Sequence, residues 1–219
     1  MSIVRRPPSI GRLHVLTDFH FQQRHDHAAL ARLAAAGGAD MIQFRQKRGS
    51  TREKWAQLVA TVAACRDAGV PLLVDDHLDL ALAAGADGVH VGQDDLPVAA
   101  ARAALARGGG RLDGFIVGAT ATTVEQAVRA EAEGANYVGF GPVFPTRSKL
   151  NPASVKGLAG LAAVCRAVGI PVIAIAGITP ERVAAVLEAG AHGVAVMTAV
   201  TTADDPQAAA AAFREALER

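Results

Sequence analysis

Short apolar runs alternate with longer, alanine-rich stretches of helical periodicity along all 219 residues of this chain. Such alternation is typical of parallel βα units, whose strands are covered on both faces and therefore read as nearly continuous apolar runs. The runs predict strands at residues 13–18, 41–45, 71–76, 88–92, 114–119, 137–141, 171–177 and 193–197. The clearest helical patterns between them cover 51–68, 97–107, 123–134, 155–168 and 179–189.

The alternation is also organised in four similar quarters. A phrase of glycine, alanine, a polar residue and alternating apolar residues begins at Gly38, Gly85, Gly134 and Gly190. Each glycine is expected to end a helix in the left-handed conformation before the next strand begins. An open doubly wound sheet shares the alternation, but eight evenly spread strands and the lack of GxGxxG after the first favour closure. We therefore predict a single-domain (β/α)₈ TIM barrel over residues 1–219, with a loosely ordered segment at 1–11.

Charge and cysteine content narrow the class of protein. The 22 Lys and Arg residues are balanced by 21 Asp and Glu, so no basic field for general nucleic-acid binding is expected. The sequence has no run of ~20 apolar residues that could cross a bilayer, and no secretory signal. Cys65 and Cys165 lack CxxC spacing and are expected to pack as small apolar residues. These features predict a cytoplasmic protein without nucleic-acid or membrane partners, and leave a homo-oligomer open.

Polar side chains gather at the carboxyl ends of the predicted strands, the ends that form the active face of such a barrel. Gln43, Arg45 and Lys47 share one parity, so all three can point toward the barrel mouth. The planar fork of arginine and the mobile charge of lysine together suit phosphate oxygens. A single lysine at a strand end is commonly just solvated, but three polar residues on an apolar strand favour an anion site.

Two carboxylates follow the third and fourth strands. Asp76 and Asp95 lie one βα unit apart, which predicts that they project from neighbouring strands. Such a pair suits Mg²⁺, which prefers hard oxygen ligands and also binds substrate phosphates. Each aspartate also precedes a helical stretch and could instead cap that helix. The cations on the adjacent strand favour one Mg²⁺ per active site, held by Asp76 and Asp95.

Further phosphate-compatible groups follow the later strands. The loop 141–152 contains three of them, Thr146, Ser148 and Lys149. Its glycine and proline residues permit a lid, although an ordinary surface turn is equally consistent with this segment alone. A second group follows strands seven and eight, where barrels often bind phosphate, and comprises Gly177, Met197 and Thr198. With no evident nucleophile or general base, these groups favour a reaction in which diphosphate leaves and charge stabilisation dominates.

The histidines are not assigned to a metal site. His20, His25 and His27 have no spacing that matches a tetrahedral site, so we expect them to be surface side chains. His90 lies inside the fourth predicted strand and is expected to belong to the core or to support the site.

Four segments together resemble the thiamine-phosphate synthase family: MIQFRQK, VDDHLDLALAAGADGVHVGQDDLP, GFGPVFPTRSK and AIAGITPERVAAVLEAGAHGVAVMTAV. The second, with its fixed aspartate spacing, is highly specific. The resemblance implies a transferase that joins 4-amino-5-hydroxymethyl-2-methylpyrimidine diphosphate to 4-methyl-5-(2-phosphoethyl)thiazole, giving thiamine phosphate and diphosphate. It also implies a dissociative, Mg²⁺-assisted mechanism in which diphosphate departs and the thiazole nitrogen captures a pyrimidine methyl cation.

The resemblance further implies a role for each matching position. Asp76 and Asp95 match the Mg²⁺ ligands. The positions implied for the pyrimidine diphosphate are Gln43, Arg45, Lys47, Asp75, Thr120 and Lys149, with Arg45, Lys47, Thr120 and Lys149 catalytic. The positions implied for the thiazole phosphate are Thr146, Ser148, Gly177, Met197 and Thr198.

Three positions depart from the family's pattern. Asp75 stands where the family usually has Asn, which places an extra carboxylate near a diphosphate. Thr122 replaces a common His, and Ala176 replaces a common Gly.

Two other functions stay open. One is the related thiazole tautomerase, an isomerase on the same barrel, whose catalytic His falls at Thr122 here. The other is a non-catalytic protein that binds thiazole phosphate or thiamine phosphate. The presence of Lys47, Asp95 and Lys149 favours the synthase, because a tautomerase has no diphosphate to hold.

Overall fold

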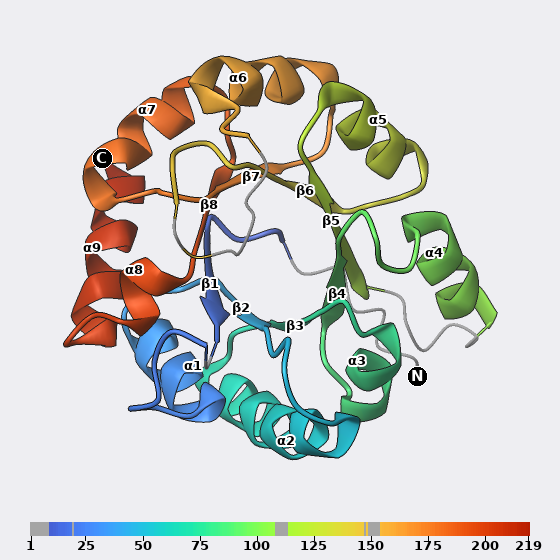
Figure 1. The fold of residues 1–219 in the computed structure, drawn as a ribbon, viewed down its shortest axis with the longest axis vertical. Helices are drawn as coiled ribbons and strands as arrows, with labels where there is room; N and C mark the ends of the chain where they lie inside the picture. Colours follow the sequence, from blue (N-terminus) through green and yellow to red (C-terminus); the bar gives the residue numbers. More distant parts are fainter. Residues whose placement is uncertain (1–8, 19, 108–113, 147, 149–153) are drawn as a thin grey trace, which may run out of the picture.

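The computed structural model describes residues 9–18, 20–107, 114–146, 148 and 154–219 (Figure 1). Parallel strands close into a barrel in chain order, and β1 pairs with both β2 and β8. The strands are β1 (Leu13–Thr17), β2 (Met41–Phe44), β3 (Leu72–Asp75), β4 (Gly88–Val91), β5 (Ile116–Ala121), β6 (Tyr137–Phe140), β7 (Val172–Ile175) and β8 (Gly193–Val196). The predicted (β/α)₈ barrel is confirmed.

Helices form a ring around the strands (Figure 1). They are α1 (His27–Ala36), α2 (Thr51–Ala68), α3 (Leu78–Ala84), α4 (Val98–Arg107), α5 (Val124–Ala132), α6 (Gly157–Ala167), the 3₁₀ helix η1 (Pro180–Arg182), α7 (Val183–Glu188), α8 (Thr198–Thr201) and α9 (Pro206–Glu218). Local sequence sets their ends: Ser50 and Glu53 form a capping box at the start of α2. Glycines at the repeated quarter positions have positive φ, as predicted, at Gly38, Gly85, Gly134 and Gly190.

The apolar core has two parts, separated by the sheet. The larger lies between the strands and the surrounding helices. The smaller fills the barrel interior and comprises Leu16, Met41, Leu73, Ile116, Tyr137, Ile173 and Ala195. His14 and His90 contact Tyr137 of this inner core, and the charged side chains lie above it at the carboxyl ends of the strands.

Some predicted boundaries are wrong. β5 begins two residues later than predicted because Gly114 adopts φ +96, and the strand runs on so that Thr120 lies within it. The single helix predicted over 179–189 is a 3₁₀ turn followed by the short helix α7. His27 is fully buried at the start of α1 and bonds Thr17, so its predicted surface position is wrong.

Several other expectations concern the ends and the surface. Residues 1–8 of the predicted loose segment lie outside the described part of the chain, while Ile10 packs against the inner core. Cys65 is buried and Cys165 half-buried, as predicted, and burial raises the pKa of Cys65 to about 12. Within the described residues, no helix is both long and apolar enough to cross a membrane.

Candidate active site

A cavity of about 920 Å³ occupies the barrel mouth. Its wall contains every predicted site residue that the structure describes: Gln43, Arg45, Lys47, Asp75, Asp76, Asp95, Thr120, Thr146, Ser148, Gly177, Met197 and Thr198. Lys149, and with it much of the predicted lid, lies outside the described residues. The barrel topology thus brings together side chains from strands far apart in the sequence.

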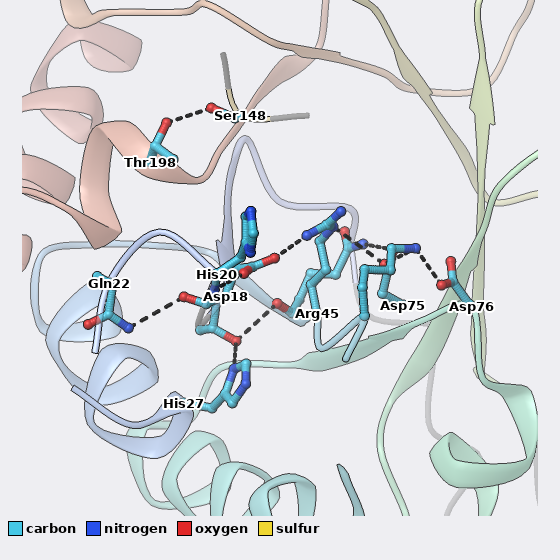
Figure 2. A network of polar contacts seen from close by, with 12 residues as sticks. Asp18, His20, Gln22, His27, Arg45, Asp75, Asp76, Ser148 and Thr198 are labelled. Atoms are coloured by element: carbon cyan, nitrogen blue, oxygen red, sulfur yellow. Dashed lines mark hydrogen bonds and ion pairs between the residues drawn. The ribbon is translucent and has the colours of Figure 1, made fainter. Parts of the chain in front are cut away.

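One side of the mouth holds a charged cluster, which we define as Asp18, Arg45, Lys47, Asp75 and Asp76 (Figure 2). Arg45 forms an ion pair with Asp18, and its Nε lies 3.7 Å from Asp75. The Lys47 ammonium lies 2.8 Å from Asp75 and also pairs with Asp76. Both cations are therefore neutralised by carboxylates of the chain itself.

Gln43 extends this cluster into the barrel. Its Nε2 donates a hydrogen bond of 2.7 Å to Oδ1 of Asp75. Asp75 is thus held by an amide on one oxygen and by Lys47 on the other, with Arg45 nearby. This answers the charge problem raised by an aspartate at this position, since two cations and a donor surround the extra carboxylate.

The ion pairs shift the pKa values of the residues that form them. Burial alone would lower the pKa of Lys47, but the carboxylates of Asp75 and Asp76 outweigh it and raise that pKa. Burial alone would raise the pKa of Asp76, but hydrogen bonds with Lys47 and Asp95 lower it. Burial and the hydrogen bond to Asp76 raise the pKa of Asp95. Asp76 and Asp95 therefore interact directly, and their pKa values move in opposite directions.

These two carboxylates fit a divalent cation. Neighbouring carboxylates repel each other when both are ionised, so a cation bound to both would be favourable. Neither residue caps a helix: Asp95 accepts from the Gly92 amide at 2.8 Å, and the position before α3 is His77. The described chain contains no group of three or more His, Cys, Asp or Glu suited to a metal. Asp76 and Asp95 could supply two oxygen ligands, and Mg²⁺ commonly takes its remaining ligands from water and substrate oxygens.

The other side of the mouth is lined by hydroxyl groups, and we define this hydroxyl pocket as Thr146, Ser148, Gly177 and Thr198; Arg182 lines the pocket that adjoins it. The Ser148 and Thr198 hydroxyls are 2.7 Å apart (Figure 2), and the Ser148 amide donates to Thr146 Oγ1 at 3.1 Å. Gly177 has φ +65, and a Cβ there would lie 2.5 Å from the Pro145 carbonyl oxygen. Only glycine allows the β7 loop to approach the β6 loop this closely.

A sequence model described as thiamine monophosphate synthase matches residues 13–200. The chain belongs to the thiamine monophosphate synthase family. A curated thiamine-phosphate synthase from Salinibacter ruber is 58% identical over 214 residues, covering 98% of this chain and 92% of that protein. Another, from Methanoculleus marisnigri, is 47% identical over 203 residues, covering 93% of each. The family and enzyme class predicted from the sequence are confirmed.

Solved structures agree with this membership of the thiamine monophosphate synthase family. Thiamine phosphate pyrophosphorylase from Pyrococcus furiosus superposes with a TM-score of 0.83 at 36% identity, covering 94% of this chain and 95% of that one. A 3-hexulose-6-phosphate synthase superposes with a TM-score of 0.67 at 23% identity, covering 94% of this chain and 100% of that one. The second likeness shows the fold alone.

Sequence reasoning missed two residues that shape the site of this thiamine monophosphate synthase family member. Asp18 directly follows β1 and pairs with Arg45, so its place at a strand end was a usable signal. Arg182 donates to the Gly177 carbonyl at 2.5 Å and lies 4.6 Å from the centre of the Phe144 ring. Nothing in the sequence pattern pointed to this link between the β6 and β7 loops.

The position of Thr122 bears on the tautomerase alternative. Its amide and its hydroxyl both donate to Gln126 Oε1, at 2.7 and 3.0 Å. Thr122 thus helps to begin α5, and a threonine cannot carry a proton as the histidine of the tautomerase would.

Proposed function

We propose that this chain is a thiamine-phosphate synthase that joins 4-amino-5-hydroxymethyl-2-methylpyrimidine diphosphate to 4-methyl-5-(2-phosphoethyl)thiazole. One observation carries the proposal: one cavity has the charged cluster on one side and the hydroxyl pocket, with Arg182 behind it, on the other. Such a cavity suits two different anions, one that leaves and one that stays bound. The relatives named thiamine-phosphate synthase support the same reaction.

In this proposal Arg45 and Lys47 bind the diphosphate. Their charges are held in place by Asp18, Asp75 and Asp76, so little reorientation is needed when the substrate arrives. Positive groups fixed beforehand stabilise an anion that develops in the transition state more effectively than mobile ones do. The family resemblance adds Lys149 to the same group.

Asp76 and Asp95 would hold one Mg²⁺. When bound, the ion would neutralise part of the charge of the diphosphate and so make it a better leaving group. Asp95 is already oriented by the Gly92 amide, which donates to its Oδ2, and its side chain also interacts with Asp76.

The hydroxyl pocket would bind the phosphate of the thiazole. Thr146, Ser148 and Thr198 offer hydroxyls, and Gly177 lets the phosphate approach the backbone closely. Bound in this way, the thiazole would present its ring nitrogen to the pyrimidine methylene carbon. Orientation of the nucleophile is then supplied by binding alone.

The proposed reaction is dissociative. The bond between the methylene carbon and the diphosphate oxygen breaks first, and its electron pair leaves with the diphosphate. The lone pair of the thiazole nitrogen then forms the new carbon–nitrogen bond, so no proton has to be removed at this step. A site rich in fixed charges and hydroxyls supports such a mechanism.

The deciding experiment measures diphosphate release from the purified chain with both substrates, with each alone, and with and without Mg²⁺. Release that requires both substrates and the metal, with thiamine phosphate formed in step, is the expected result. Binding of thiazole phosphate without any diphosphate release would reject the synthase in favour of a binding protein. Conversion of a thiazole isomer without the pyrimidine substrate would indicate the tautomerase.

A further inference from the structure

Three polar side chains form a chain of hydrogen bonds beneath the charged cluster. The Tyr137 hydroxyl lies 2.8 Å from Nδ1 of His90, and Nε2 of His90 lies 2.8 Å from Oγ1 of Thr120. All three residues line the cavity, but Tyr137 is 1% exposed and His90 8% exposed, whereas Thr120 is half-buried. The chain of bonds therefore leads from the buried floor of the cavity to its more open wall.

Glycines make room for this chain. In the register of β4, β5 and β6, His90 and Tyr137 flank Gly118 from its two sides. A Cβ at Gly118 would overlap the Tyr137 ring, so the missing side chain lets the two rings meet across the strand between them. Gly139 is the partner of Thr120, and a Cβ there would lie 3.1 Å from Cε1 of His90. Two interior positions are thus kept empty for these rings.

The direction of the hydrogen bonds follows from the burial of Tyr137. Within the described residues, His90 is the one hydrogen-bond partner recorded for the Tyr137 hydroxyl. If that hydroxyl accepted from Nδ1, its own hydrogen would be buried without an acceptor, which is unfavourable. If it donates to Nδ1, Nε2 carries the hydrogen and donates to Thr120. The second arrangement satisfies the Tyr137 hydroxyl and both ring nitrogens of His90.

The same direction fixes the role of Thr120. Its oxygen already accepts from His90, and its backbone carbonyl accepts from Gln93 Nε2 at 2.5 Å. The hydroxyl hydrogen of Thr120 is therefore left for a group in the cavity, and that group must be an acceptor. Burial raises the pKa of Tyr137 and lowers that of His90, which is consistent with a neutral imidazole between two hydroxyls.

We propose that Tyr137, acting through His90, fixes the Thr120 hydroxyl as a hydrogen-bond donor to an anionic oxygen in the cavity. Tyr137 and His90 are thus positioning residues, and Thr120 is the residue that touches the anion. The identity of that anion as the diphosphate rests on the proposed function. A hydroxyl held as a donor favours an anion over a neutral or donating group. The Tyr137–His90–Thr120 relay would therefore add to the selectivity of the charged cluster for anions.

The first test reads the histidine tautomer and needs no activity. Nitrogen-15 NMR of the full chain distinguishes a protonated from an unprotonated ring nitrogen, and His90→Gln identifies the His90 signals among the seven histidines. We expect hydrogen on Nε2 in the wild type, and loss of that fixed tautomer in Tyr137→Phe. Hydrogen on Nδ1 in the wild type would overturn the proposal.

The second test is a double-mutant cycle on diphosphate release. Thr120→Val keeps the shape of the side chain but removes the donor, and we expect kcat to fall roughly 10- to 100-fold. Tyr137→Phe should lower kcat about 3- to 10-fold with KM for the thiazole phosphate unchanged. In the Thr120→Val background, Tyr137→Phe should change kcat less than about 2-fold, because its effect passes through the lost hydroxyl.

If the two substitutions lowered kcat independently, so that their fold-changes multiplied in the double variant, Tyr137 would not act through Thr120. That outcome would contradict the proposal. Thr61→Val is the matched control, because it removes a buried hydroxyl that bonds Gln57 in α2, away from the cavity. It should lower Tm without changing kcat. If the wild type releases no diphosphate, the proposed function fails, and the tautomer measurement still decides the relay.

Discussion

The two sides of the barrel mouth bind anions by different means. The charged cluster relies on Arg45 and Lys47, whose charges are already paired with carboxylates of the chain. The hydroxyl pocket has uncharged donors, with Ser148 of the loop after β6 bonded to Thr198 at the start of α8 (Figure 2). On the first side a ligand would share cations that carboxylates already hold, whereas on the second side it would replace one hydrogen bond between hydroxyls.

This difference predicts different sensitivities. Charge-assisted contacts are stronger than neutral ones and depend on the balance of charges around them, so single changes on the charged side should alter catalysis. Neutral hydroxyls contribute smaller and more local terms, so changes there should alter binding. The following variants either break this division of labour or sharpen it.

The largest expected effect belongs to Asp95→Ala. Removing one of two carboxylates proposed to hold Mg²⁺ should lower kcat about 10²- to 10³-fold and abolish the dependence on the metal. Binding of the thiazole phosphate, measured by calorimetry, should stay within about 2-fold, because the hydroxyl pocket is untouched. Asp79→Ala is the control, since Asp79 is an exposed carboxylate on α3. Normal turnover of Asp95→Ala would reject the metal assignment.

Acid should weaken the scaffold beneath the charged side. The buried histidines, His14, His27 and His90, belong to β1, α1 and β4, on that side of the barrel. Burial lowers the pKa of His14 and that of His27 from 6.5 to about 4. Between these values the unfolded chain binds protons that the folded chain excludes, so stability falls as pH falls. At pH 5 the loss is about 2 kcal/mol for each histidine.

Urea unfolding at pH 7.5 and pH 5 measures this loss. His14→Gln should remove its share of the pH dependence, whatever it does to stability at pH 7.5. His20→Gln, which changes an exposed histidine, should leave the full dependence in place. Equal pH dependence in His14→Gln and in the wild type would show that the buried ring is not the titrating group.

In the hydroxyl pocket, Thr198→Val should weaken binding of the thiazole phosphate. It removes the hydroxyl that bonds Ser148 and one proposed donor to the thiazole phosphate. KM for the thiazole phosphate should rise about 10-fold, with a smaller change in kcat and the same dependence on Mg²⁺. Ser154→Ala, an exposed position of the following segment, serves as the control. A changed metal dependence in Thr198→Val would show that the two sides are not separate.

Much of the fold could be predicted because the alternation of strands and helices is encoded in short stretches of the sequence. Apolar runs and the glycines at Gly38, Gly85, Gly134 and Gly190 fix where strands begin, and their φ values agree. The predicted start of β5 at Gly114 is wrong, because the positive φ of Gly114 places this residue in a turn before the strand. The sequence does not indicate whether a glycine inside an apolar run has a positive or a negative φ.

The residues of the site could be predicted where their position depends only on which residues end each strand. Parity placed Gln43, Arg45 and Lys47 in one cavity because it is a property of the strand itself. The partners of these groups depend on neighbouring strands, so the sequence did not indicate that Asp18 pairs with Arg45. The same holds for the contact of His90 with Tyr137, which requires the register of three strands and a glycine between them.

The smallest expected effect is also the most informative about the charged side. Asp75 accepts from Gln43 Nε2 at 2.7 Å on one oxygen and attracts Lys47 on the other. Asp75→Asn keeps an oxygen for Gln43 but removes the charge, so Lys47 and Arg45 become more available to a diphosphate. We expect KM for the pyrimidine diphosphate to fall about 2- to 5-fold, with kcat preserved.

Asp75→Ala separates the two parts of that expectation. It removes the charge and also the acceptor for Gln43, so it should lose the orientation of that amide and raise KM rather than lower it. A gain in Asp75→Asn together with a loss in Asp75→Ala would mean that the carboxylate holds Gln43 by its oxygen and restrains Lys47 by its charge. A collapse of kcat in Asp75→Asn would instead mean that the charge itself is needed, and the cations of this side would then depend on three carboxylates rather than compete with one of them.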